Sequence, residues 1–308
     1  MSESNKRNFI VHGSILAIAG ILVRIIGMLY RIPVVNIIGS EGNGIYGAAF
    51  NIYNIMLVLS SYGLPMAVSK LVSARFTKRR YKSAAKVLRC SLMVAVCTGG
   101  IAALLVFFGA SFIENVIYGG GLPGLAIPLR ILAPTIFLVA ILGVIRGFFQ
   151  GQSTMIPTAV SQILEQIVNA IVSIAAGYGM MKAFASSPDV AAYGAAGSTL
   201  GTAMGALTAV LFMGFLYAVY TPTFNRLKRK DRHTENQSTG QICKIIIYTM
   251  IPIILGQTFY QISALIDDVM FSNIMVGRDI TKSISMDLGN FSSSYSLLIG
   301  IPQGVASA

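Results

Sequence analysis

The chain has 308 residues, of which 55% are hydrophobic and 11% are charged, and its formal net charge is +12 at pH 7. Because a soluble domain carries about 25% charged residues, this composition excludes an ordinary soluble protein and indicates one embedded in lipid. A basic chain can bind nucleic acid, but the 23 lysines and arginines lie mostly in short loops between apolar stretches, so we expect no nucleic-acid partner.

Eight apolar stretches follow one another along the chain, and most of them match the length of about 20 residues that a helix needs to cross a bilayer. The sequence therefore predicts an all-α, polytopic membrane protein. The predicted stretches cover residues 9–38, 45–69, 88–110, 125–148, 157–181, 196–220, 242–266 and 291–308.

The connections between these stretches alternate in charge. The first connection holds Glu41 alone and the third holds Glu114 alone, whereas the second and the sixth are strongly basic. Basic loops remain on the cytoplasmic side, so we expect a cell-membrane protein with a cytoplasmic N-terminus. The second connection would also suit anionic lipid headgroups, although topology alone explains its charge. The basic residues are Lys70, Arg75, Lys78, Arg79, Arg80, Lys82, Lys86 and Arg89 in the second connection and Arg226, Lys228, Arg229, Lys230, Arg232 and Lys244 in the sixth.

The first stretch carries Arg24 in its middle, with apolar residues on both sides. A guanidinium at mid-membrane costs about 2.5–3.5 kcal/mol, so we expect Arg24 to line a hydrated, positively charged cavity. Arg31 follows two helical turns later on nearly the same face, and paired planar guanidinium groups are suited to phosphate. We predict that Arg24 and Arg31 bind a diphosphate. The alternatives are an ion pair with a neighbouring helix for Arg24 and snorkelling to the interface for Arg31.

A second pair of ionisable residues lies on the fourth and fifth stretches. Arg146 and Glu165 fall at comparable depths on neighbouring antiparallel helices, and an unpaired carboxylate at that depth would be protonated. We predict that the two side chains form an ion pair that acts as a structural clamp, with a substrate contact as the alternative.

Acidic residues offer a third candidate site. Asp267 and Asp268 end the seventh stretch, and adjacent helical residues point about 100° apart, so we expect one of them to face the cavity and the other to face water. Asp267 and Glu41 are our candidates for a cavity ion pair or for binding a coupling cation. A solvated helix end is the alternative for the aspartates.

Two similar helix breaks suggest an internal duplication. Gly63-Leu-Pro65 in the second stretch resembles Gly300-Ile-Pro302 in the eighth, and each is followed by small residues and a serine. Many transporters are built from two related bundles around a midplane site, although Gly and Pro are common enough in spanning helices for a chance similarity. We predict a six-helix lobe over residues 1–240 and the first two helices of a second lobe over 241–308. Since two helices could not enclose a cavity, we expect the chain to be part of a longer protein.

Neither enzymatic nor metal chemistry is indicated by the sequence. The three cysteines have no metal or redox spacing, and the loops lack the carboxylate clusters that would hold a catalytic metal. A Walker-type glycine-rich loop is also missing from the sequence. We therefore predict that the chain is not an enzyme and uses no cofactor or metal.

Three motifs resemble a known family: Val23-Arg24-Ile-Ile-Gly27, Gly63-Leu-Pro-Met-Ala-Val-Ser-Lys70, and Arg146-Gly-Phe-Phe-Gln-Gly continuing through Pro157 to Glu165-Gln166. They look like stage V sporulation protein B-type polysaccharide transporters, which are similar to MurJ-type lipid II flippases of the multidrug/oligosaccharidyl-lipid/polysaccharide exporter superfamily. The resemblance implies two six-helix lobes around a cationic, V-shaped cavity, with Arg24 and Arg31 at the substrate. Gram-negative flippases also have arginines in the second helix, and residues 45–69 have none.

These observations support a flippase that moves an undecaprenyl-diphosphate-linked cell-wall glycan by alternating access. Its expected partners are the lipid-linked oligosaccharide, membrane lipids and a coupling cation. One alternative is a cation-coupled multidrug exporter, whose cavity should carry net negative charge, whereas arginines here outnumber buried acids. The other is a non-transporting membrane component of envelope assembly.

Overall fold

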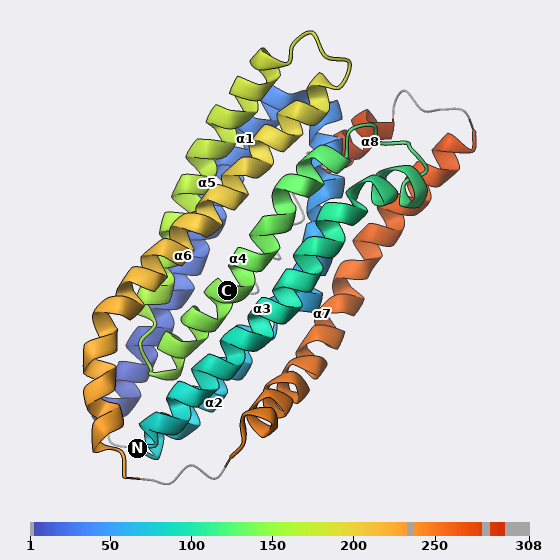
Figure 1. The fold of residues 1–308 in the computed structure, drawn as a ribbon. Coiled ribbons are helices and arrows are strands. Elements are labelled where there is room, and N and C mark those ends of the chain that lie inside the picture. The colour runs from blue at the N-terminus through green and yellow to red at the C-terminus, as the bar shows by residue number, and fades with distance from the viewer. Residues whose placement is uncertain (1–2, 233–236, 279–283, 293–308) are drawn as a thin grey trace.

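The computed structural model describes residues 3–232, 237–278 and 284–292. Within these ranges the chain is helical and has no strand, which confirms the predicted all-α membrane fold. Figure 1 shows long helices that run side by side along one axis. The elements are α1 (Glu3–Ser61), α2 (Leu64–Thr77), α3 (Tyr81–Phe112), the π-helical turn η1 (Ile113–Ile117), α4 (Ala126–Gly151), α5 (Ile156–Ala183), α6 (Val190–Lys230), α7 (Thr239–Val276) and α8 (Ile284–Asn290).

Helix α1 reverses its direction at Gly39. This residue has φ 68° and ψ 178°, a backbone conformation that glycine adopts without the steric cost that a Cβ atom brings. The two halves of α1, 3–38 and 40–61, therefore form a hairpin (Figure 1). The first two predicted stretches correspond to these halves, and they are joined by a single non-helical residue.

The second half of α1 stops at Ser61, and α2 begins at Leu64. Pro65 lies in the first turn of α2, where its missing N–H would have no helical partner in any case. The Gly63-Leu-Pro65 motif thus interrupts the second apolar stretch at the position that the sequence indicates. The similar motif at Gly300-Ile-Pro302 lies outside the described residues, and so does residue range 293–308 of the predicted eighth stretch.

Helices α5 and α6 pack closely because α6 carries glycine at every fourth position of one face. A Cβ atom on Gly197 would meet the backbone of Ala176, one on Gly201 would meet Ser173, and one on Gly205 would meet the carbonyl oxygen of Glu165. Small residues at this spacing let two membrane helices bring their backbones together. Helices α1 and α4 also contact α6, so these elements form one closely packed group.

Helices α7 and α8 join this group mainly through α1. Helix α7 contacts α1, α2 and α3, and α8 packs on α1. Near its C-terminal end α7 is attached by two hydrogen bonds: Ser272 Oγ donates to the Tyr118 carbonyl at 2.8 Å, and Asn273 Nδ2 donates to the Ile117 carbonyl at 2.7 Å. Helix α8 is attached where Asn43 Nδ2 donates to the Gly289 carbonyl at 2.8 Å.

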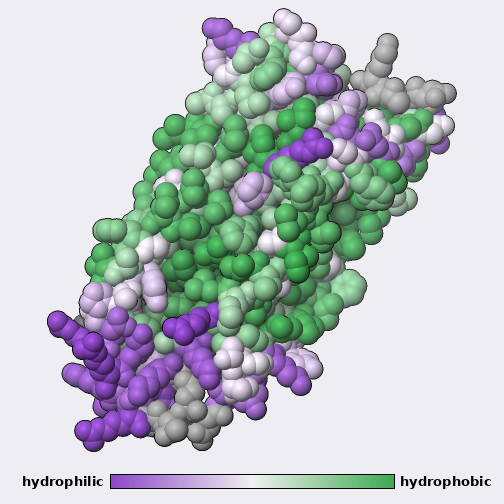
Figure 2. Space-filling view, in the orientation of Figure 1, coloured by the Kyte–Doolittle hydropathy of each residue, from purple (hydrophilic) through white to green (hydrophobic). Residues whose placement is uncertain are grey.

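The surface has a wide apolar middle and a strongly basic end. Six helices of the described part are long and apolar enough to cross a membrane, and Figure 2 shows apolar residues over the middle of the molecule and hydrophilic residues at the end that carries the N-terminus. The protein is therefore a multi-pass membrane protein. Because the predicted connections at 70–89 and 221–244 both reach this end, it gathers most of the lysines and arginines.

The basic connections are more helical than the sequence indicates. Helix α2 continues to Thr77 and α3 begins at Tyr81, which leaves a turn of three residues where we expected a loop. Helix α6 likewise continues to Lys230 through three basic residues in its last turn. Charge does not interrupt backbone hydrogen bonding, and cations are favourable at a helix C-terminus, so the helices extend past the apolar stretches that define them in the sequence.

Candidate functional site

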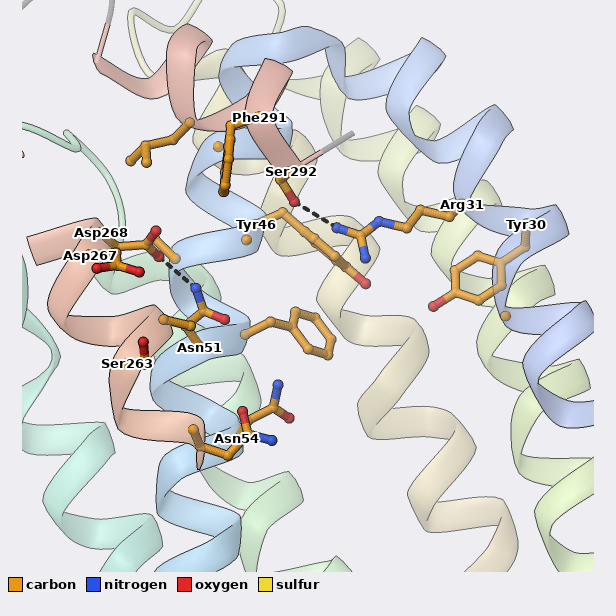
Figure 3. A pocket seen from close by; sticks show the side chains of 18 residues that line it. Tyr30, Arg31, Tyr46, Asn51, Asn54, Ser263, Asp267, Asp268, Phe291 and Ser292 are labelled. Atoms are coloured by element: carbon orange, nitrogen blue, oxygen red, sulfur yellow. Dashed lines mark hydrogen bonds between the residues drawn. The ribbon is translucent and has the colours of Figure 1, made fainter. Parts of the chain in front are cut away.

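A polar cavity of 590 Å³ lies between both halves of α1, helix α7, and α8 with the residues that follow it (Figure 3). The hairpin at Gly39 creates one side of it, because only a reversal of α1 brings residues near 30 and residues near 50 to the same space. The lining residues are Gly27, Tyr30, Arg31, Gly44, Tyr46, Gly47, Ala48, Phe50, Asn51, Asn54, Gln261, Ser263, Ala264, Asp267, Asp268, Leu288, Phe291 and Ser292.

Arg31 provides the positive charge of the cavity. Its Nη2 donates a hydrogen bond of 2.9 Å to Ser292 Oγ, and its guanidinium carbon lies 5.9 Å from the centre of the Tyr46 ring, within the range of a cation–π contact. Its Nε is buried and has no hydrogen-bond partner among the described residues. The side chain is therefore held in place by Ser292 and Tyr46 at the cavity wall.

Asn51 and Asp268 form the opposite side. Asn51 Nδ2 donates a hydrogen bond of 2.6 Å to Asp268 Oδ2, and Figure 3 shows this pair across the cavity from Arg31. Asp267 lines the same side. We expected only one of the two aspartates to face the cavity, and the structure places both at its edge. The cavity spans a wide enough arc around α7 to receive two side chains that point about 100° apart.

The charge of the lining differs from the expected cationic cavity. In the described part of the chain, the lining contains one arginine and two aspartates. The sequence places more arginines than acids at membrane depth, but these arginines do not converge on this cavity. Among the described residues, the lining of the cavity therefore carries more acid than base.

Two predicted residues lie away from this cavity. Arg24 precedes Arg31 by two helical turns, which is about 10 Å along the axis towards the basic end, and its side chain is exposed and outside the lining. Glu41 follows the reversal at Gly39 and is exposed, also outside the lining. Of the four residues that we expected at the cavity, the structure brings Arg31 and Asp267 to it.

The Arg146 and Glu165 side chains meet between α4 and α5. Arg146 Nη2 lies 2.7 Å from Glu165 Oε2, and Arg146 Nε donates a hydrogen bond of 2.9 Å to Ser161 Oγ. Neither ion-pair partner lines the cavity. The neighbouring Gln166 reaches α1, since its Nε2 lies 3.1 Å from the position that a Cβ atom would have on Gly27. The ion pair is thus one residue away from a contact with the cavity wall.

Most of the polar lining of α1 was not predicted from the sequence. Asn51 and Asn54 carry no charge, so they are less conspicuous in an apolar stretch than arginine or aspartate. A signal for them exists: Asn43, Gly47, Asn51 and Asn54 recur at intervals of three or four, which places them near one face of a helix. A polar stripe of this kind in a spanning helix indicates a face turned away from lipid.

Comparisons with known proteins give concordant matches. A family described as polysaccharide biosynthesis protein matches residues 10–308. The chain is 34% identical over 176 residues to the lipid II flippase MurJ of Bacillus subtilis, covering 55% of this chain and 32% of that protein. It is 30% identical over 210 residues to stage V sporulation protein B of the same organism, covering 68% of this chain and 39% of that protein. The chain spans about half the length of the curated relatives that it matches, since 95% of it covers 53% of a further membrane protein of Bacillus subtilis.

Solved structures show the same helical arrangement. The fold is similar to the inward-facing conformation of a multidrug resistance MATE family transporter of the MOP superfamily, with a TM-score of 0.65 and 16% identity over 94% of this chain and 63% of that one. It is also similar to a MOP superfamily transporter from Pyrococcus furiosus, with a TM-score of 0.62 and 16% identity over 95% and 64% of the two chains. At this level of identity the likeness concerns the fold.

Proposed function

Because the chain belongs to the polysaccharide biosynthesis protein family, as its sequence motifs indicated, we propose that it takes part in moving a lipid-linked glycan across the cytoplasmic membrane. The finer proposal is a flippase for undecaprenyl-diphosphate-linked cell-wall precursors that works by alternating access. The observation that carries it is the polar cavity between α1, α7 and α8 inside an otherwise apolar bundle. The similarity to the lipid II flippase MurJ of Bacillus subtilis supports the substrate class.

The position of the cavity suits this function. We propose that residues 1–240 form one lobe and that α7 and α8 begin a second, so the cavity lies at the junction between lobes, where transporters commonly bind substrate. Its 590 Å³ falls within the range of about 300–1,000 Å³ that is typical of small-molecule sites. Polar sugars would enter this space, while the lipid tail would remain among the exposed apolar side chains of the helices.

Arg24 and Arg31 are the proposed ligands of the diphosphate. We place the basic end, and with it the N-terminus, in the cytoplasm on the positive-inside rule. Arg24 is then nearer the leaflet in which the precursor is made, and Arg31 lies deeper, at the cavity. A substrate that enters from the cytoplasm would meet Arg24 first and Arg31 second.

Transport of this kind involves no bond breaking, and the proposal is accordingly for a transporter and not an enzyme. The membrane potential can supply about 2.3 kcal/mol per elementary charge for each 100 mV. Asp267, at the cavity, and Glu41, near the reversal of α1, are the proposed sites for a coupling cation or a transient ion pair.

A flipping assay tests the proposal. The protein would be reconstituted into vesicles that hold a fluorescent undecaprenyl-diphosphate-linked glycan in both leaflets, and a membrane-impermeant quencher would report transfer between leaflets. We expect Arg24→Ala and Arg31→Ala to reduce the rate at least tenfold. Arg130→Ala is the matched control, because Arg130 bonds to Ser111 on the exposed surface, away from the cavity. Unaltered transfer in both the Arg24 and the Arg31 variant would overturn the assignment of these arginines.

A cation-coupled drug exporter is a second candidate, and one observation favours it. The described lining carries two carboxylates against one guanidinium, a balance that would attract a cationic drug. In the same vesicles, uptake of ethidium that is lost in Asp268→Asn, together with no transfer of the glycan lipid, would favour the exporter over the flippase.

A further inference from the structure

The geometry points to a sugar-binding subsite on the side of the cavity formed by Asn51, Asn54 and Asp268. We propose that this side binds hydroxyl groups of the glycan, and that the diphosphate stays on the Arg31 side. The inference rests on the proposed function, because it divides one lipid-linked glycan between two sides of the cavity. It assigns to α7 and the second half of α1 a role in selecting the glycan.

Charge is the first reason for the division. Asp267 and Asp268 lie on the same side of the lining, and two carboxylates repel a diphosphate, which is itself an anion. Arg31 lies on the other side, bonded to Ser292 and stacked near Tyr46. A substrate with a charged end and an uncharged end is therefore accommodated in one orientation, with its phosphates towards Arg31.

Hydrogen-bonding capacity is the second reason. The bond of 2.6 Å from Asn51 Nδ2 to Asp268 Oδ2 leaves Asn51 Oδ1 and Asp268 Oδ1 as acceptors, held in a fixed relation to each other. A sugar hydroxyl donates one hydrogen bond and accepts others, so neighbouring hydroxyls can donate to these two oxygens. Asn54, Gln261 and Ser263 add side chains that both donate and accept. Hydrogen bonds to a carboxylate are stronger than neutral ones, which makes Asp268 the principal contact.

Aromatic rings supply the third feature. Tyr46 and Phe50 lie with their ring centres 4.5 Å apart, and both line the cavity together with Phe291. Rings of this kind present flat apolar surface beside the polar side chains. The C–H face of a sugar ring removes water from such a surface on binding, while its hydroxyl edge reaches the asparagines and Asp268.

A comparison of two lipids tests the inference. The probes are undecaprenyl diphosphate and undecaprenyl-diphosphate-linked N-acetylglucosamine, and their dissociation constants for the purified protein would be measured by microscale thermophoresis in detergent. We expect the sugar-bearing probe to bind wild-type protein about tenfold more tightly than the sugar-free probe. We expect Asn51→Leu to remove this difference by weakening the sugar-bearing probe alone. We expect Asp268→Asn to remove the preference for the sugar-bearing probe, because the sugar loses its carboxylate partner while the sugar-free probe is no longer repelled. Arg31→Gln should weaken both probes.

Each other outcome has a defined meaning. Equal affinity of the wild type for the two probes, or an equal loss for both probes in Asp268→Asn, would overturn the sugar subsite and leave the proposed function standing. Failure of both probes to bind the wild type would overturn the proposed function and the subsite with it. Asp287→Asn is the control, since this aspartate on α8 is exposed and outside the lining. Melting temperatures of all variants would show that each one folds.

Discussion

The α5–α6 interface and the junction of α1 with α7 and α8 differ in how far their close packing extends. Helices α5 and α6 meet along a row of glycines that would not admit a Cβ atom, and the ion pair of Glu165 lies at the edge of this group. The junction has equally close backbone packing where Gly289 of α8 meets Ser40 of α1, but beside this contact it encloses a cavity. Close backbone packing along a whole interface resists relative motion, whereas a single close contact beside a cavity leaves room for it. We infer that α1 to α6 move as one body and that the junction is where the molecule opens.

The largest expected effect comes from filling the α5–α6 interface. A side chain on Gly201 would collide with Ser173 and the backbone of Asn169. We expect Gly201→Leu to lower the free energy of unfolding by about 3 kcal/mol, the upper part of the usual range for overpacking, measured by denaturation in detergent. Gly214→Leu, on the same helix with no neighbour within 4 Å, should change it by less than about 0.5 kcal/mol. Equal effects of the two substitutions would show that the interface is not closely packed.

The Arg146–Glu165 ion pair should give a smaller effect. The two side chains are 15% and 26% exposed, so the loss should be below the 3–5 kcal/mol of a fully buried pair. We expect Arg146→Leu to cost about 2 kcal/mol of unfolding free energy. A double-mutant cycle with Glu165→Leu should give a coupling energy of about 1 kcal/mol or more. A coupling energy near zero would show that the Arg146–Glu165 ion pair does not stabilise the fold, and it would favour a role for these side chains in binding the substrate.

A substitution at the junction should change the stability less, but it should increase the access of reagents to the cavity. A Cβ atom on Gly289 would collide with the Ser40 carbonyl. We therefore expect Gly289→Ala to separate α8 from α1, at a cost of about 1 kcal/mol. Maleimide labelling of Asn54→Cys, in a background without the native cysteines, should become several-fold faster.

The matched control for this experiment is Gly256→Ala on α7, where no atom lies within 4 Å of the added Cβ. Its labelling rate should equal that of the parent. If Gly289→Ala lowers the stability of the whole bundle as much as Gly201→Leu does, the two regions are not mechanically distinct.

The smallest expected effect on stability comes from a substitution at the C-terminal end of α7. Asn273→Ala removes the hydrogen bond to the Ile117 carbonyl, and one such bond contributes about 1 kcal/mol. Hydrogen exchange should quicken in the last turns of α7 and stay unchanged in α5 and α6. Asn115→Ala is the control, because Asn115 of η1 bonds to the Ser111 carbonyl four residues earlier and not to α7. Faster exchange throughout the bundle would contradict a local attachment.

The features that were predictable from sequence are those that depend on local pattern. Apolar length predicts the spanning helices, and the Gly63-Leu-Pro65 motif indicates the break before α2. The pairing of Arg146 with Glu165 was accessible for the same reason, since a short turn between antiparallel helices places residues at comparable depths near each other.

The cavity depended on information that local pattern does not contain. Helical spacing aligns Arg24 with Arg31, but the extent of the cavity, which ends near Gly27 on this half of α1, decides that only Arg31 lines it. Asp268 reaches the cavity only because α7, which is distant in sequence, packs on α1. Residues 293–308 of the predicted eighth stretch lie outside the described structure.

The hairpin at Gly39 bears on the way the protein is made. Because α1 reverses within a single segment, Arg31 and Asn51 face the same space as soon as the first 61 residues have been synthesised. Asp268 leaves the ribosome much later, at about 5–20 residues per second. During this interval Arg31 and Asn51 have no partner from α7, so we expect their polar groups to contact water or lipid headgroups. We infer that the N-terminal hairpin forms first during biogenesis and that the later helices pack against it.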